Sequence, residues 1–81
     1  MTLDELLGAV YHATYRTPSQ LAVARQKLAD ALANDAALSA EARDRLAQLD
    51  AFAAKIGENL MPERDVIGHI HRQALRLALG T

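Results

Sequence analysis

Histidine has the widest chemical range of the residue types in this chain, because imidazole binds metals and exchanges protons near neutral pH. The chain has His12, His69 and His71, and it has no cysteine. His69 and His71 would point about 200° apart on a helix, so the two cannot hold one ion. Asp65 precedes His69 by one helical turn. That spacing is more typical of a solvated ion pair than of a metal site, which needs three or four converging ligands. We predict no metal site.

The sequence also contains no motif of a catalytic nucleophile and no phosphate-binding loop. Ser19 and Ser39 both stand where a helix start would use them as caps, and neither is in the strand-to-helix turn of a nucleophile elbow. The four glycines are isolated rather than clustered in a loop. We therefore expect no catalytic residues, no cofactor and no enzymatic activity.

Three basic side chains share one face of the predicted C-terminal helix: His69, Arg72 and Arg76. The two arginines are four residues apart and repel each other, which the anion of a partner would relieve. One hypothesis is therefore a small regulator that binds nucleic acid through this helix. Two facts weaken it: cations near a helix C-terminus also complement the helix dipole, and the net charge of −1 gives no overall attraction to nucleic acid or membrane.

Two capping signals predict where the first helices begin. Thr2 and Glu5 form a capping box, in which each side chain bonds the backbone amide of the other residue. Thr17 and Gln20 repeat the pattern, with Pro18 at the first helical position. We expect one helix to start directly after Thr2, and a break before Thr17.

The second and third helices are expected to form an antiparallel hairpin. The second is predicted over 18–33 and the connection over 34–38, with Ser39 capping the third helix. The third carries apolar residues at steps of four and three, the spacing of a buried seam: Ala42, Leu46, Leu49, Ala53, Ile56 and Leu60. A corner is predicted between Gly57 and Pro62, and a fourth helix from Pro62 to about Leu79.

Every periodic segment has the helical repeat, so the predicted fold class is all-α. We expect a small bundle of three to four helices with a central antiparallel helical hairpin, forming one domain over 1–81. Alanine supplies much of the 51% hydrophobic content, which favours helices that approach closely around a small core. The acidic N-terminal start and the lack of a long apolar run predict a soluble, cytoplasmic protein without a membrane segment.

Charge is unevenly distributed along the chain. From Leu6 to Ala29 there are three Lys and Arg residues and no acid, whereas five acids and two bases lie between Asp30 and Asp50. This asymmetry could orient a partner, but attraction between two helices of the same chain explains it more simply.

The fourth helix has apolar residues on two sides. One arc of six is assigned to the core: Val66, Ile67, Ile70, Ala74, Leu77 and Ala78. Leu75 and Leu79 lie outside it, and we interpret them as a second contact surface, flanked by Arg72, Arg76 and His69. The preferred hypothesis is a non-enzymatic protein-interaction module, such as a regulator, inhibitor, chaperone or adaptor, acting through helix contacts as a homodimer.

Overall fold

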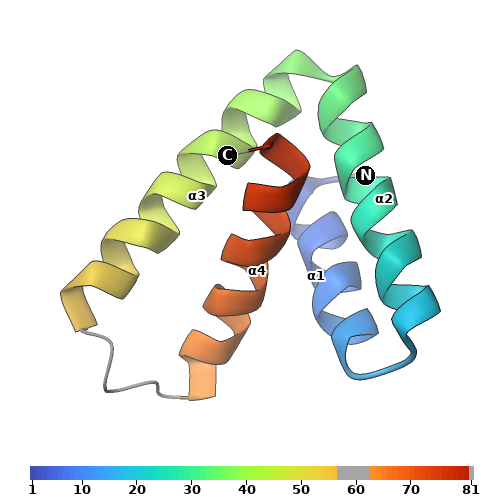
Figure 1. The fold of residues 1–81 in the computed structure, drawn as a ribbon. Helices are drawn as coiled ribbons and strands as arrows, with labels where there is room; N and C mark the ends of the chain where they lie inside the picture. Colours follow the sequence, from blue (N-terminus) through green and yellow to red (C-terminus); the bar gives the residue numbers. More distant parts are fainter. Residues whose placement is uncertain (57–62, 81) are drawn as a thin grey trace.

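The computed structural model describes residues 1–56 and 63–80, and nearly all of them are helical (Figure 1). The four helices are α1 (Leu3–Thr14), α2 (Pro18–Asn34), α3 (Ala36–Ile56) and α4 (Glu63–Leu79). No strand occurs in these ranges, and the prediction of an all-α bundle is confirmed. The predicted corner between Gly57 and Pro62, with Leu60, lies outside the described residues.

Both predicted capping signals start helices. The Thr2 hydroxyl accepts the Glu5 amide at 3.2 Å, and α1 begins at the next residue. At α2 the box is complete, since the Thr17 hydroxyl accepts the Gln20 amide at 3.2 Å and the Gln20 side chain accepts the Thr17 amide at 3.4 Å. The predicted break before Thr17 is therefore confirmed.

The start of α3 differs from the prediction. Asp35, not Ser39, supplies the cap, because the Asp35 carboxylate accepts the Leu38 amide at 3.1 Å. Aspartate caps a helix as well as serine does, and this aspartate comes first along the chain. The helix consequently begins at Ala36, and the connection shrinks from the predicted 34–38 to the single residue Asp35.

From this one-residue connection α2 and α3 diverge, and α4 lies between them while α1 lies beside α2 (Figure 1). As a result α4 contacts all three other helices. The core contains fully buried leucines from three helices, namely Leu3 and Leu7 of α1, Leu28 of α2 and Leu75 of α4. From α3 it receives the buried Ala42, with Leu46 and Leu49 partly buried against it. The predicted seam of the third helix is therefore confirmed at Ala42, Leu46 and Leu49, whereas the side chains of Ile56 and Leu60 lie outside the described set.

The predicted orientation of α4 about its own axis is only partly correct. Ala74 of the assigned core arc is buried, and Ile70 and Ala78 of the same arc pack against the core. Leu77, assigned to the core arc, is 65% exposed, and Ile67 of the same arc is 37% exposed. Leu75, assigned to the outer face, is 0% exposed, and Leu79 is partly buried against the core. The prediction assumed that a bundle covers one side of its last helix. Because α4 lies among three helices, a wider part of its circumference is covered.

Candidate functional site

The predicted second apolar face of α4 is not an open surface. Leu75 is in the centre of the core, and Leu79 packs against it. A leucine that is already fully buried within its own chain has no area left to offer a partner. The assignment of Leu75 as a partner-contacting side chain is therefore corrected: it holds α4 in the bundle, and the partly buried Leu79 packs against the same core.

The two arginines of α4 are paired within the chain. Arg72 Nε and Arg76 Nη2 each donate a hydrogen bond of 2.8 Å to the same oxygen, Oδ1 of Asp50 on α3. The hydrogen bond from Arg76, followed by that from Arg72, holds the pKa of the Asp50 carboxyl below its usual value, although burial opposes this shift. The repulsion between the arginines, which suggested an external anion, is relieved by this carboxylate.

His69, the third basic residue of that predicted face, lies apart from this cluster. Its Nε2 is 3.1 Å from the side-chain nitrogen of Gln73, one turn later on the exposed side of α4. The predicted pairing of His69 with Asp65 concerns a side chain outside the described set. Among the side chains that are described, no three imidazoles or carboxylates are close enough together to hold a metal ion.

A second charged cluster joins α1, α3 and α4. Asp4 and Arg45 form an ion pair of 2.9 Å, and His71 lies beside them, half-buried. The His71 Nε2 is buried without a hydrogen-bond partner among the described residues. Burial, and then the charge of Arg45, lowers the pKa of His71, while Asp4 acts in the opposite direction. Burial of this imidazole within the bundle therefore favours its neutral form.

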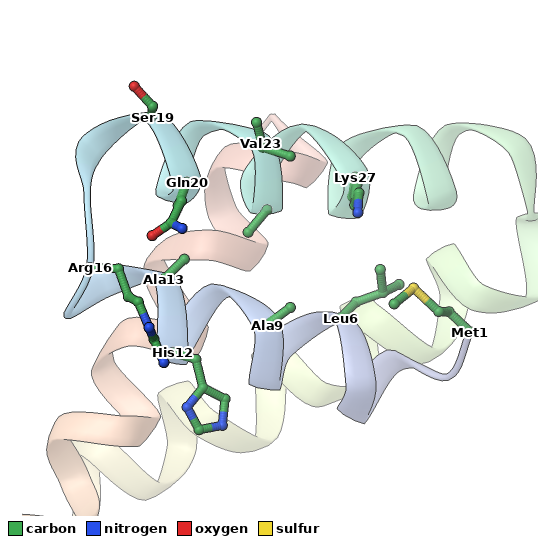
Figure 2. A pocket seen from close by; sticks show the side chains of 11 residues that line it. Met1, Leu6, Ala9, His12, Ala13, Arg16, Ser19, Gln20, Val23 and Lys27 are labelled. Atoms are coloured by element: carbon green, nitrogen blue, oxygen red, sulfur yellow. The ribbon is translucent and has the colours of Figure 1, made fainter.

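An open groove runs between α1 and α2, on the side of this helix pair away from the leucine core (Figure 2). Its volume is about 430 Å³. Small and medium apolar side chains form its floor: Leu6, Ala9, Ala13, Val23 and Ala24. Lys27 and Met1 lie at one end, while Arg16, His12, Gln20 and Ser19 gather at the other (Figure 2).

The groove follows from how the sequence builds this helical pair. Only residues 15–17 separate α1 from α2, so the two helices run back along each other. Most of their large leucines are buried in the core, and alanines line the groove: Ala9 is exposed, whereas Ala13 and Ala24 are buried at its base. Alanine fills little space, so a hollow remains, and Val23 beside it is 56% exposed.

Basic side chains line this hollow without any carboxylate. Arg16 and Lys27 are both exposed and make no ion pair with a described acidic residue, and the imidazole of His12 lies near Arg16. This arrangement can hold a ligand that combines an apolar surface with negative charge. The sequence analysis did not identify the groove, because it assigned no role to Val23. The signal that could have revealed it is the stretch from Leu6 to Ala29, which has no acid.

Comparison with known proteins finds no matching family model, no curated relative and no similar solved structure. Within the described residues, no helix has the length and apolar character needed to cross a membrane. The geometry of the groove is therefore the main guide to function.

Proposed function

We propose that this chain is a non-enzymatic protein-interaction module that receives a helix of its partner in the groove between α1 and α2. The observation that carries the proposal is the apolar groove itself, in which Val23 is 56% exposed above the buried side chains of Leu6, Ala13 and Ala24. The role is that of a small regulator, inhibitor, chaperone or adaptor, acting in the cytoplasm.

The shape of the floor suits a helix. Alanines at Ala9, Ala13 and Ala24 allow a third helical backbone to approach α1 and α2 closely, as in recognition of a helix in a groove. Complete burial of a valine side chain contributes about 1.5 kcal/mol or more, so Val23 is the expected centre of the contact. Since the floor is short, we expect affinity on the order of micromolar rather than nanomolar.

A second copy of this chain is one possible partner. The expectation of a homodimer depended on Leu75 and Leu79, which the core uses. If the protein self-associates, we expect the groove rather than α4 to form the contact, and cross-links between copies at Val23 would reveal it.

Nucleic-acid recognition by α4 is the alternative, and it has less support. Arg72 and Arg76 share the Asp50 carboxylate and would have to leave it to contact phosphates. The alternative predicts a steep loss of duplex DNA binding as salt concentration rises, and it predicts that alanine at Arg72 and Arg76 reduces this slope.

Photo-cross-linking in the native cell tests the proposal. A photoreactive amino acid replaces Val23 in the groove or, as the control, the adjacent exposed Ala22, which is not among the groove residues. We expect a discrete adduct from position 23, with the attached peptide lying in one helix of the captured protein, and little adduct from position 22. Equal labelling from both positions, or none from position 23, would contradict the proposal.

A further inference from the structure

We infer that the helix held in this groove is amphipathic and acidic, with carboxylates at both ends of the apolar face that contacts Val23. The inference rests on the proposed function, and it specifies the chemistry of the partner.

The charges of the groove carry this inference. Lys27 lies at one end of the floor and Arg16 at the other, with only uncharged side chains and His12 between and around them (Figure 2). Neither cation forms an ion pair with a described acidic residue, whereas Arg45 pairs with Asp4 elsewhere in the bundle. A docked helix with a carboxylate near each end would therefore meet an unpaired cation at both.

The spacing of these cations sets the spacing of the carboxylates. The start of α2 lies beside Arg16, and Lys27 lies nearly three turns into that helix. At a rise of 1.5 Å per residue, these points are about 15 Å apart along the α2 axis, and long flexible side chains shorten the span. Carboxylates seven to eleven residues apart on one face of a partner helix meet this requirement, because both separations are close to whole numbers of turns.

Two other anionic ligands fit less well. A fatty acid carries one charged end and would leave the second cation unused. A nucleic-acid duplex presents many phosphates but no apolar face that could cover Val23 and the alanine floor. A helix that has an apolar face with a carboxylate near each end can cover the floor and also pair with both cations.

Synthetic helical peptides test the inference directly. The first probe has an alanine and leucine face bounded by two glutamates eleven residues apart; the second has glutamine, and the third lysine, at those two positions. Binding to the full chain is measured by fluorescence anisotropy and located by amide chemical shifts. We expect the glutamate peptide to bind about three- to tenfold more tightly than the glutamine peptide, with shifts centred on Val23 and Ala9. The lysine peptide should bind least.

Charge reversal supplies the second arm. Arg16→Glu with Lys27→Glu should abolish the preference for the glutamate peptide and transfer it to the lysine peptide. The matched control is Arg43→Glu with Lys55→Glu, which changes the net charge equally at exposed positions of α3 and should keep the parental preference. Circular dichroism of each variant checks that the helices are retained.

The outcomes separate this inference from the proposed function. If the glutamine and glutamate peptides bind equally at Val23, the groove binds helices without regard to charge, and the inference fails while the proposed function stands. If no peptide shifts the groove amides, both are overturned. Tighter binding of dodecanoate or of a DNA duplex at the same amides would also overturn the inference, and would replace the helix with that ligand.

Discussion

The pair Arg72 and Arg76 on α4 and the pair Arg16 and Lys27 at the groove differ in whether the fold provides a counter-charge. The α4 arginines are one turn apart and share Asp50, which is 22 and 26 residues away along the chain. Among the described residues that line the groove, no carboxylate accompanies its two cations. Basic residues on one face of a helix therefore do not by themselves indicate a charged partner, because a carboxylate from a distant part of the same chain can already pair with them.

Apolar residues show the same contrast. Leu75, which the α4 pattern assigns to an outer surface, is completely buried, whereas Val23, on the mostly polar α2, is exposed above a hollow. Whether a neighbouring helix covers the side chain decides if it is buried or exposed. Five predictions test whether these groups are covered or paired within the fold, beginning with the largest effect.

Removing the Leu75 side chain should produce the largest change. Leu75→Ala is expected to lower the free energy of unfolding by about 2 to 5 kcal/mol, because it leaves a cavity among three helices. Leu77→Ala on the same helix is the control and should cost less than about 0.5 kcal/mol, since Leu77 is largely exposed. Urea unfolding followed by circular dichroism measures both. A larger cost at Leu77 would restore the orientation of α4 predicted from the sequence.

Removing the shared carboxylate should have an intermediate effect. Asp50→Asn is expected to lower stability by about 1 kcal/mol at neutral pH, because both arginines lose a partly exposed ionic partner. Asp44→Asn is the control, since Asp44 is exposed on α3 and has no ion pair among the described residues. Equal changes in the two variants would mean that Asp50 contributes nothing beyond an ordinary surface acid.

The lowered pKa of Asp50 gives this difference a pH dependence. The ion pair stabilises the fold above the ordinary aspartate pKa of about 3.9 and loses its effect as the pH falls through the lower folded value. The gap between the parent and Asp50→Asn should therefore be constant near neutrality and close progressively below about pH 4. A gap that persists at the acid end would show that it does not come from the charge.

A smaller effect is expected from His71. Since its pKa is lowered in the folded chain, the unfolded chain binds the proton more readily, and stability should fall as the pH decreases below about 6.5. The slope cannot exceed about 1.4 kcal/mol per pH unit for one proton, and partial burial makes it smaller. His71→Asn should remove this slope in urea unfolding measured from pH 7.5 to 5. His69→Gln, which retains His71, should keep the parental slope; a loss there would contradict the assignment.

The smallest effect on stability is expected at the groove itself. Arg16→Glu with Lys27→Glu should change the free energy of unfolding by less than about 0.5 kcal/mol, because neither cation pairs with a described acidic residue. Thermal unfolding of this variant beside Asp50→Asn compares the two cation groups directly. A groove variant as unstable as Asp50→Asn would mean that these cations support the fold.

Local signals were sufficient to predict the elements of the fold. The starts of α1 and α2 depend on side chains within three residues of each other, so Thr2 and Thr17 could be assigned from the sequence. The seam of α3 was predictable from its spacing, since Ala42 is buried and Leu46 and Leu49 pack against the core. The start of α3 was misassigned because Asp35 and Ser39 are both good caps, and only the structure decides which one acts.

The site was not predictable for a different reason. The burial of Leu75 and the pairing of Asp50 with Arg72 depend on the position of α4 between the other helices, which no local pattern encodes. The groove exists because no described helix packs over Ala9 and Val23. The periodicity of one helix cannot show whether another helix covers it. Sequence periodicity locates the apolar side of a helix, but it does not tell how many neighbours share that side.

The central place of α4 has a consequence for synthesis. The ribosome makes α1 first and α4 much later, yet Leu7 and Leu75 belong to the same core. While the chain is emerging, only α3 can cover the leucine side of α1 and α2, so the nascent protein exposes part of this apolar surface until α4 is made. We expect the bundle to close only after synthesis of Leu75, and a chain released before that point to depend on chaperones or be degraded.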